Sequence, residues 1–427
     1  MRIGGADMIN KIAVLKKHME KKGKIEIIGK AEIKNKEDLS TYYTPGVAYV
    51  SEAIKKNKEL AYEYTNKANT IAIISDGTRI LGLGNIGPEA GLPVMEGKSM
   101  LFKKYAGVDA IPICLGTTDE NEIIKIIKAL EPSIAGVNIE DIESPKSFRI
   151  IKETSRITEI PIFHDDQYGT AVVTLAALNN ALKLARKGKN SKIIIFGSGS
   201  AGYGITKLLS FAGYKKLYVF DSKGIIKKGR KTDMNEFKNE LAAITNLENK
   251  ELTINEAVNG ADVIIGVSGK KGYFKKDWIK KMNKKSIVFA LSNPDPEITY
   301  DDALKAGAFI AATGKSNSPN QVNNIIAFPG IIRGLLEVRA KTVNLHMLMK
   351  AAEVISKMTE DNLAIDRIIP SALDEKTISD LVVKMAVAVG TTAIKSNNAR
   401  IKLTPFQIKT NSERAIKHYQ RIENLLF

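Results

Sequence analysis

Two neighbouring carboxylates, Asp165 and Asp166, lie where an apolar segment ends and a helical segment, residues 171–184, begins. Strand-to-helix junctions of this kind hold the ligand sites of open α/β sheets. A second acidic pair, Glu140 and Asp141, ends another apolar segment. Because hard divalent cations prefer oxygen ligands, the two pairs together predict a metal site. The alternative is that Asp165 or Asp166 only caps the helix that follows.

A glycine-rich turn of the kind that binds dinucleotides follows a predicted strand at residues 192–196. Residues 197–202 have the sequence Gly-Ser-Gly-Ser-Ala-Gly, the G-x-G-x-x-G pattern between a strand and a helix. The glycines permit the tight turn, the approach of the backbone to a pyrophosphate and the packing of helix on strand. The helix N-terminus then faces the phosphates. The candidate nucleotide contacts in this turn are Gly197, Gly199, Ser200, Ala201 and Gly202.

Asp221 ends the next predicted strand, 24 residues after Gly197, where such motifs carry an acid that binds the ribose. An acid there accepts hydrogen bonds from a 2′-hydroxyl and repels a 2′-phosphate, which favours NAD over NADP. Lysines at positions 223, 227 and 228 follow closely and can neutralise such a phosphate, so NADP stays open. A structural turn without a ligand is the alternative, which the combination of strand, helix and acid disfavours.

Composition and charge indicate a soluble globular protein. With 427 residues, 44% of them hydrophobic and 26% charged, the chain can form two domains with substantial cores. The net charge of +17 raises nucleic acid as a partner, but the lysines are spread along the chain and no nucleic-acid-binding motif is present. We therefore expect no nucleic-acid partner.

Apolar segments and cysteine usage point to the cytoplasm. No apolar run approaches the ~20 residues that span a bilayer, and the first 24 residues lack the apolar core of a signal peptide. We expect a cytoplasmic enzyme with no membrane partner. Cys114 is the only cysteine and lies in an apolar segment, which predicts a buried, inert thiol.

Predicted strands and helices alternate from about residue 70 to residue 312, which favours parallel sheets flanked by helices. The chain is predicted to be helical from Pro329 onward, with a break at residues 396–398 and Pro405. The predicted strands are 70–74, 108–114, 133–139, 160–163, 192–196, 216–220, 261–266, 286–290 and 308–312.

Three further segments are unusual. They are Tyr-Tyr-Thr-Pro-Gly-Val-Ala at 42–48, the glycine-rich segment 75–87 with its continuation Val-Met-Glu-Gly-Lys at 94–98, and Asn-Gln-Val-Asn-Asn-Ile-Ile-Ala-Phe-Pro-Gly at 320–330. With the acidic pairs, they resemble the malic enzymes, specifically the short prokaryotic type without a phosphotransacetylase-like extension. The resemblance runs from about Tyr42 to at least Gly330.

This resemblance implies oxidation of (S)-malate to pyruvate and carbon dioxide with NAD, or NADP, and Mg²⁺ or Mn²⁺. Decarboxylation of oxaloacetate is implied as well. A malolactic enzyme, which retains NAD and releases lactate, is the alternative within this class. An inactive ligand-sensing relative, or a nucleic-acid-binding protein that kept the fold, is an alternative of a different class, which the complete set of catalytic residue types disfavours.

The resemblance also implies a role for each candidate residue. Tyr43 corresponds to the general acid that protonates the enolpyruvate carbon, Lys98 to the general base for the C2 hydroxyl, and Asp165 to an acid beside that lysine. The implied metal ligands are Glu140, Asp141 and Asp166. The implied substrate contacts are Arg79, Asn293, Asn323 and Asn324, and Asn293 also contacts the cofactor.

The chemistry sets conditions on two of these residues. A lysine acts as a base only when its pKa is lowered from its ordinary ~10.4, which a nearby metal and partial burial would do. A tyrosine acts as an acid when its phenolate is stabilised, and Lys98 is the expected neighbour of Tyr43. The plain alternatives are a half-buried Tyr43, a surface Lys98, and an Arg79 that pairs with Asp76.

The predicted fold class is α/β, with a Rossmann-type dinucleotide-binding domain and a second α/β domain completed by C-terminal helices. By resemblance, residues 164–330 form the nucleotide domain, and residues 1–163 with the helical segment 331–427 form the other. The active site lies in the cleft between them, where hinge closure excludes water. The N-terminal region and the helical tail are the expected contacts of a homodimer.

Overall fold

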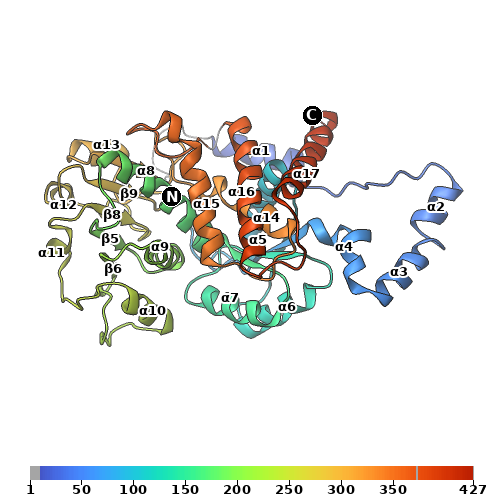
Figure 1. The fold of residues 1–427 in the computed structure, drawn as a ribbon, viewed down its shortest axis with the longest axis horizontal. Coiled ribbons are helices and arrows are strands. Elements are labelled where there is room, and N and C mark those ends of the chain that lie inside the picture. The colour runs from blue at the N-terminus through green and yellow to red at the C-terminus, as the bar shows by residue number, and fades with distance from the viewer. Residues whose placement is uncertain (1–9, 372–373, 427) are drawn as a thin grey trace.

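The computed structural model describes residues 10–371 and 374–426. Two β-sheets with their covering helices form the body of the molecule, and an N-terminal arm extends to one side (Figure 1). In this view the second sheet and its helices lie on the left, the C-terminal helices in the middle, and α2 (Lys36–Tyr42) and α3 (Val47–Lys56) of the arm on the right, while α1 (Lys11–Lys21) appears in the middle.

The first sheet has four parallel strands in the order β2-β1-β3-β4. Its inner strands β1 and β3 are buried along their whole length, as expected of a parallel sheet covered on both faces. The strands are β1 (Thr70–Ser75), β2 (Asp109–Cys114), β3 (Gly136–Ile139) and β4 (Ile162–His164), and the connecting helices are α5 (Pro88–Ala106), α6 (Glu120–Leu130) and α7 (Lys146–Ile157).

Cys114 is less buried than predicted, because it ends a strand at the edge of the sheet. β2 pairs only with β1, and its side chains are less covered than those of β1. Cys114 is therefore partly buried rather than buried. That degree of burial still raises the pKa of the thiol, so the residue remains a poor nucleophile.

The second sheet has six strands in the order β10-β9-β8-β5-β6-β7. All are parallel except the last, a two-residue strand that runs antiparallel to β6. Apart from that strand, this is the order of a dinucleotide-binding doubly wound sheet, whose switch point lies between β5 and β8. The strands are β5 (Ile193–Phe196), β6 (Leu217–Asp221), β7 (Gly224–Ile225), β8 (Val263–Gly266), β9 (Ile287–Ala290) and β10 (Ile310–Thr313).

Helices cover both faces of this sheet, so the predicted fold class is confirmed. Each of the nine predicted strands overlaps an observed strand, whereas β7 was not predicted because two residues carry no periodicity. The helices are α8 (Thr170–Ala185), α9 (Ser200–Phe211), α10 (Glu236–Ile244), α11 (Ile254–Val258), α12 (Lys276–Lys280) and α13 (Tyr300–Lys305).

The C-terminal helices connect the two sheets. Every residue of α14 is buried, and it packs against α16 and α5, while α15 packs against α8. The predicted break is confirmed, because α16 ends at Lys395 and the next helix begins at Pro405. The elements are η4 (Asn324–Ile326), α14 (Phe328–Glu337), α15 (Leu345–Met358), η5 (Glu360–Asn362), α16 (Glu375–Lys395) and α17 (Pro405–Leu426).

One helix in the described part of the chain, α16, is long and apolar enough to cross a membrane by length and composition alone. Half of its apolar window is buried inside the protein, against α14, α15 and α17. Core helices of folded domains pass the same test, and the packing of α16 accounts for its apolar character.

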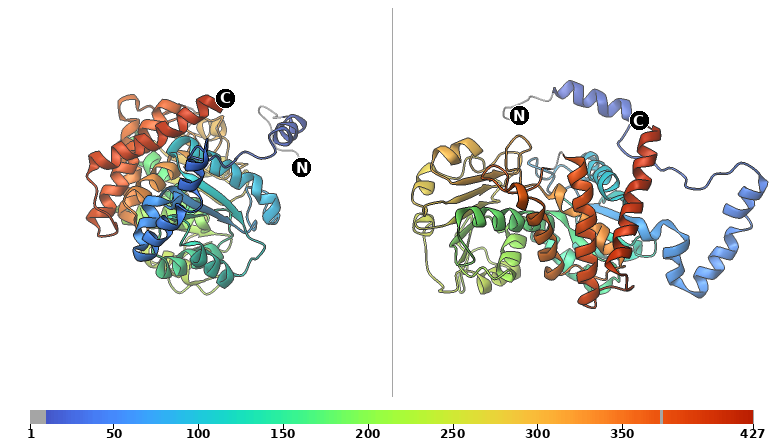
Figure 2. Two further views of the ribbon diagram at one scale, coloured as in Figure 1. Left: turned by 90° about the vertical axis from the view of Figure 1, so that its right-hand side faces the viewer. Right: turned by 45° about the horizontal axis from the view of Figure 1, so that its top comes forward.

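The helices of the N-terminal arm, residues 10–56, project from the body (Figure 2), and between them Lys24 bonds to Glu96 and to the carbonyl oxygen of Pro93 in α5. None of its three helices contains a buried residue, and isolated helices of this length are only marginally stable in water. The arm therefore lacks the apolar cover that helices of a folded protein normally have. Its helices are α1 (Lys11–Lys21), α2 (Lys36–Tyr42) and α3 (Val47–Lys56), followed by η1 (Lys58–Leu60), α4 (Ala61–Tyr64) and η2 (Asn66–Asn69).

Candidate functional site

The carboxyl ends of both sheets border one cavity of about 350 Å³, called here the central cavity. The first sheet contributes residues that follow β1, β3 and β4, and the second contributes residues that follow β5, β8, β9 and β10. Open α/β sheets bind their ligands at this edge. Most predicted site residues line the central cavity: Arg79, Lys98, Glu140, Asp141, Asp166, Gly199, Ser200, Ala201, Asn293, Asn323 and Asn324.

Lys98 extends from α5 into this cavity and is bound by two carboxylates. Its Nζ lies 2.9 Å from Oε1 of Glu140 and 2.5 Å from Oδ2 of Asp165, and 4.4 Å from the ring centroid of Phe328. Only 11% of the side chain is exposed, so the alternative of an ordinary surface lysine is wrong. Burial acts to lower the pKa of Lys98, but the charges of Asp165 and Glu140 outweigh it and raise that pKa above its ordinary value. The expected lowering therefore does not occur in the protein alone.

Asp165 is completely buried behind Lys98, in a single turn of π-helix, η3 (Asp165–Gly169), that leads into α8. Such turns are rare overall but recur at functional sites. The turn ends in glycine for a steric reason, because a Cβ on Gly169 would lie 1.9 Å from Oδ1 of Asp165. No side chain caps α8, so the alternative that Asp165 or Asp166 serves as a helix cap is wrong.

The three predicted metal ligands, Glu140, Asp141 and Asp166, face the central cavity together. Burial raises the pKa of Glu140 well above its ordinary range; Lys98 opposes this, and the neighbouring acids add to it. Burial, and then the charge of Asp166, raise the pKa of Asp141 to about 7. This repulsion is what a bound cation would relieve, so the donor set suits a divalent metal.

These acids have the chemistry of a metal site, but they are not arranged as one. Among residues 10–371 and 374–426, no three His, Cys, Asp or Glu side chains form a group arranged to hold a metal ion. Glu140 is engaged elsewhere, because Oε1 pairs with Lys98 and Oε2 accepts a hydrogen bond of 2.7 Å from Asn138. Each of these oxygens keeps a second lone pair for an ion, so ligation by all three carboxylates requires the side chains to move closer together rather than Glu140 to lose a partner.

Arg79 lines the central cavity and also a second, smaller cavity beside the glycine turn. Asp76, its alternative partner, is buried and accepts hydrogen bonds from Lys146 Nζ, at 2.5 Å, and from Thr78. The alternative of a surface pair between Arg79 and Asp76 is therefore wrong. The planar donors of Arg79 remain for a ligand in the cavity, and they suit a carboxylate.

The predicted substrate amides lie on two loops of the second sheet. Asn323 is the N-cap of η4, and its Oδ1 accepts a hydrogen bond of 3.0 Å from the backbone N–H of Ile325 in that turn. Asn293 packs against Gly314, where an added Cβ would lie 2.7 Å from its Nδ2. Both side chains are thus held by local contacts as they line the cavity with Asn324.

The glycine turn is shaped to receive a diphosphate. Gly197 has a φ of +117°, and an added Cβ would lie 2.4 Å from the carbonyl oxygen of Val267. At Gly202 an added Cβ would lie 1.9 Å from the carbonyl oxygen of Gly197, so only glycine lets α9 pack this closely. No side chain caps the N-terminus of α9, which leaves its first N–H groups for an anion.

Asp221 lines the smaller cavity but has charged partners of its own. Arg230 binds Asp221 in a bidentate contact, with Nη1 2.8 Å from Oδ1 and Nη2 2.5 Å from Oδ2. Lys238 Nζ lies 2.9 Å from Oδ2. Burial acts to raise the pKa of Asp221, but the hydrogen bonds from Arg230 and Lys238 outweigh it and lower that pKa. Sequence reasoning missed both cations, which lie 9 and 17 residues beyond Asp221 with no local signal.

Tyr43 lies outside the central cavity. It follows α2 in the arm, and 66% of the residue is exposed. It is not among the residues that line the cavity around Lys98. Tyr43 and Lys98, which we expected to be neighbours, are therefore not close to each other within one chain. The alternative of a half-buried Tyr43 is also wrong, because most of the residue is exposed.

Glu297 is a structural member of the site that sequence reasoning missed. It is fully buried, and its Oε1 accepts hydrogen bonds from the backbone N–H and the hydroxyl of Ser268, both at 2.8 Å, and from the hydroxyl of Ser292, at 2.5 Å. These bonds tie the loop after β8 to the loop that carries Asn293. The signal in the sequence, a glutamate close to a Ser-Asn-Pro turn, is too weak to predict this.

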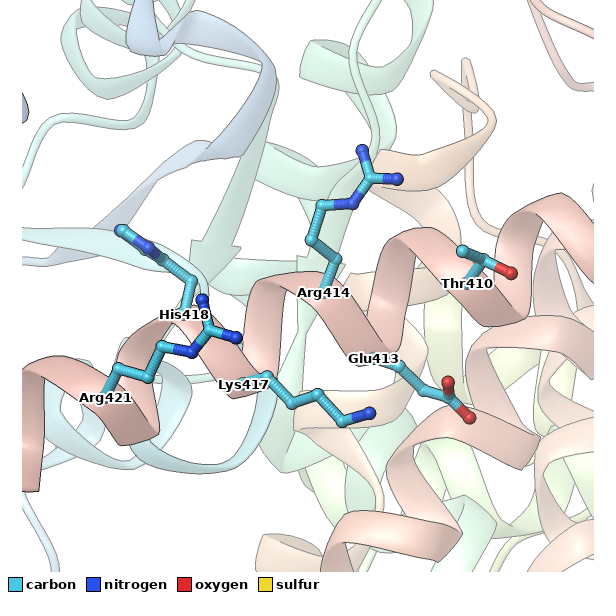
Figure 3. A pocket seen from close by; sticks show the side chains of 6 residues that line it. All are labelled: Thr410, Glu413, Arg414, Lys417, His418 and Arg421. Carbon is cyan, nitrogen blue, oxygen red and sulfur yellow. The ribbon is translucent and has the colours of Figure 1, made fainter.

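A shallow basic hollow on α17 lies apart from both cavities (Figure 3). Its side chains project from a single helix, and none is a predicted site residue. The hollow belongs to the general excess of basic residues over the surface. Its lining residues are Thr410, Glu413, Arg414, Lys417, His418 and Arg421.

Comparison with known proteins agrees with this arrangement. Residues 22–155 match the family model of the malic enzyme N-terminal domain, and residues 167–394 match that of the malic enzyme NAD-binding domain. The bifunctional malic/malolactic enzyme of Bacillus subtilis is 47% identical, over 92% of this chain and 95% of that protein. The NAD-dependent malic enzyme of Geobacillus stearothermophilus is 48% identical, over 83% of this chain and 74% of that protein.

A solved structure shows the same likeness in three dimensions. The crystal structure of the malic enzyme of Entamoeba histolytica superimposes with a TM-score of 0.92 at 37% identity, covering 97% of this chain and 88% of that one. The family models, the related sequences and the overall fold thus agree on one family. The chain is an enzyme of the malic enzyme family.

Proposed function

We propose that the chain oxidises (S)-malate to pyruvate and carbon dioxide, with NAD⁺ or NADP⁺ as hydride acceptor and Mg²⁺ or Mn²⁺ as cofactor. The observation that carries this proposal is the convergence of Lys98, the acidic residues and the dinucleotide turn on one cavity. Curated relatives include both NAD-dependent and NADP-dependent malic enzymes. Decarboxylation of oxaloacetate is proposed at the same site, because it needs the same binding groups.

Lys98 is the proposed general base. Its Nζ takes the proton of the malate C2 hydroxyl as hydride leaves C2. The two carboxylates that hold it raise its pKa, so Lys98 is protonated while both are ionised and uncompensated. Ligation of a cation by Glu140 would remove part of that negative charge and favour the neutral amine. Asp165 then remains to orient Nζ.

The proposed metal ligands are Glu140, Asp141 and Asp166. A bound Mg²⁺ or Mn²⁺ supplies Lewis acidity, which acidifies the C2 hydroxyl and stabilises the enolate charge that forms on decarboxylation. Support comes from the raised pKa values of Glu140 and Asp141, which reflect burial of several acids without enough positive charge.

The remaining site residues are proposed to bind and orient the substrate and the nucleotide. Arg79 is proposed to bind a malate carboxylate through its guanidinium, and Asn293, Asn323 and Asn324 to donate hydrogen bonds to substrate or nicotinamide. The N-terminus of α9, with Gly197, Gly199, Ser200, Ala201 and Gly202, is proposed to bind the diphosphate.

Tyr43 is the proposed general acid for the enolpyruvate carbon, and we infer that it acts in the cavity of a second chain. Within its own chain it is exposed and outside the cavity. In a homodimer, the arm of each chain would lie over the other chain and bring Tyr43 close to the partner's cavity. The site would then be complete only in the dimer.

The apolar surface of the arm supports this arrangement. The arm exposes twelve large apolar residues, although none of its helices has a buried side for them. Burial of apolar area is the main driving force of association, and a second copy of the chain would supply the missing cover. The exposed residues are Ile12, Leu15, Met19, Ile25, Ile27, Ile28, Ile33, Leu39, Tyr42, Tyr43, Val47 and Tyr49.

A malolactic reaction is the second candidate, favoured by the 47% identity to the bifunctional enzyme of Bacillus subtilis. In that reaction the reduced nucleotide stays bound and returns its hydride to pyruvate. Product analysis distinguishes the two functions. Pyruvate with an equal amount of free reduced nucleotide supports malate oxidation, whereas lactate without free reduced nucleotide would favour the malolactic reaction.

The domain organisation stays part of the proposal. Residues 164–330 are proposed as the nucleotide domain, and residues 1–163 with 331–427 as the other domain, closing over the central cavity. A cytoplasmic location and the absence of nucleic-acid or membrane partners also remain predictions. The direct test of the function is a malate assay with each nucleotide, with Mn²⁺ and with EDTA; no malate consumption under any condition would contradict it.

A further inference from the structure

Asp221 stands where a dinucleotide-binding sheet carries the acid that binds the adenosine ribose, at the end of β6 beside the glycine turn. It lines the smaller cavity, about 210 Å³ in volume, together with Gly197, Gly199 and Ser222. A free carboxylate here would accept bonds from a ribose hydroxyl and repel a 2′-phosphate. The contacts of Asp221 decide whether it can do either.

The carboxylate of Asp221 has no acceptor capacity left. Oδ1 accepts from Arg230 Nη1 and from the backbone N–H of Lys223, each at 2.8 Å. Oδ2 accepts from Arg230 Nη2 at 2.5 Å and pairs with Lys238 Nζ at 2.9 Å. A carboxylate offers about four lone-pair sites, and these four contacts occupy them. A ribose hydroxyl must therefore displace a charged donor to bind Asp221.

The charges around the cavity offset the negative charge of Asp221. Arg79, Lys238 and Lys270 line the cavity, and Arg230, which is not among the lining residues, is bound to Asp221. Asp233 is the other nearby acid, 2.7 Å from Lys238 Nζ. Four cations thus stand against two carboxylates, which offsets the repulsion that would exclude a 2′-phosphate.

The lysines closest to Asp221 in sequence do not contribute to the positive charge that lines this cavity. Lys227 pairs with Glu251 at 2.7 Å, and neither it nor Lys223 nor Lys228 lines the cavity. Lys238 is different, because it lines the cavity and its ammonium is already shared between two carboxylates. A phosphate dianion can attract it without leaving Asp221 unpaired, since Arg230 remains.

We propose that Lys238, assisted by Lys270, binds the 2′-phosphate of NADP, and that Asp221 is held by Arg230 so that the site accepts NADP as well as NAD. This assignment rests on the nucleotide site of the proposed function. It removes the preference for NAD that Asp221 suggests in the sequence. Lys238 is thereby a specificity-determining residue.

Binding of adenosine fragments tests this without turnover. Calorimetry on the full chain would compare 5′-AMP with 2′,5′-ADP, which differ only in the 2′-phosphate. The wild-type protein is expected to bind 2′,5′-ADP at least as tightly as 5′-AMP. In Lys238→Gln, the affinity for 2′,5′-ADP relative to 5′-AMP is expected to fall about tenfold or more, because a charged hydrogen bond is lost.

Two further variants keep the test decisive. Lys270→Gln changes an exposed lysine of the same cavity and is expected to lower the ratio in the same direction. Lys228→Gln, the matched control outside the cavity, is expected to leave the ratio unchanged. The ratio of kcat/KM for NADP to that for NAD is expected to follow the binding ratio.

The outcomes separate this inference from the proposed function. Wild-type protein that binds 5′-AMP more than about tenfold tighter than 2′,5′-ADP would overturn the inference and leave the nucleotide site standing. An unchanged ratio in both Lys238→Gln and Lys270→Gln would do the same. Failure of the wild-type protein to bind either fragment would overturn the nucleotide site itself, and the inference with it.

Discussion

Lys98 Nζ and Asp165 Oδ2 lie 2.5 Å apart, although the two residues are 67 positions apart in the sequence. Asp165 is completely buried, so its charge acts on Lys98 with little screening by water. The contact holds the proposed base in the lining of the central cavity. It also raises the pKa of Lys98, so the base depends on its surroundings to lose its proton.

Replacement of Lys98 by alanine is expected to abolish malate oxidation and to leave nucleotide binding intact. A positioned general base typically contributes about 10²–10⁴-fold to the rate, and the proposed diphosphate site is formed by the glycine turn and the N-terminus of α9, not by Lys98. Turnover is measured by reduced nucleotide and binding by calorimetry. Lys104→Ala, on the same helix but in surface ion pairs with Glu375 and Glu423, is the matched control. Near-normal turnover of Lys98→Ala would remove this residue from the mechanism.

Replacement of Gly169 by alanine tests the position of Asp165. The added Cβ would lie 1.9 Å from Oδ1 of Asp165, so the carboxylate must shift from the position in which its Oδ2 binds Lys98. A misplacement of about 1 Å can cost about 10²-fold in rate, and we expect a loss of kcat of that order. Gly188→Ala, where an added Cβ would meet nothing within 4 Å, is the control. Equal kcat for the two variants, both folded by circular dichroism, would show that this contact is dispensable.

The affinity for Mn²⁺ is expected to fall as the pH drops below about 7. Burial and the charge of Asp166 raise the pKa of Asp141 to about 7, so below that pH a proton competes with the metal for its oxygens. Calorimetry should show an affinity about tenfold weaker at pH 6 than on the plateau above pH 8, with proton release on binding. A pH-independent affinity would argue against Asp141 as a ligand.

Removal of the metal or of one ligand gives an independent check. EDTA is expected to abolish turnover, and added Mn²⁺ to restore it. Asp166→Ala is expected to weaken Mn²⁺ binding strongly, because it removes one of three carboxylates. An unchanged Mn²⁺ affinity in this variant would mean that the metal lies elsewhere.

Tyr43 and Lys98 are expected to complement each other between chains. Tyr43→Phe and Lys98→Ala should each be nearly inactive as homodimers. If the arm acts on the partner, co-expressed variants form heterodimers in which one of the two sites has both native residues. Random pairing then restores about one quarter of the wild-type activity.

The same experiment excludes the alternative. If Tyr43 and Lys98 act within one chain, each half of the heterodimer lacks one of them, and the mixture stays inactive. Gel filtration measures the oligomeric state of each variant. A monomer with full activity would contradict the dimeric site.

The sequence determined the order of the elements and most of the cavity lining. Buried parallel strands are visible as apolar segments, and their carboxyl ends must meet at one edge of a sheet. The acids at positions 140, 141 and 166 were predicted to form one metal site for that reason, whereas their meeting with the glycine turn of the other sheet was implied only by the family resemblance. The central cavity confirms their convergence, while their catalytic and metal-binding roles remain proposals.

Only the tertiary structure decided the pKa values and the hydrogen-bond partners of the site residues. The pKa of Lys98 depends on burial and on charges brought from distant elements, and their sum has the opposite sign to the expectation from burial alone. Asp221 is occupied by Arg230 and Lys238, and Tyr43 lies on an arm that leaves the body of its own chain. Periodicity and motifs report local geometry. Ion pairs, electrostatic shifts of pKa values and contacts between chains depend on which distant segments meet in space.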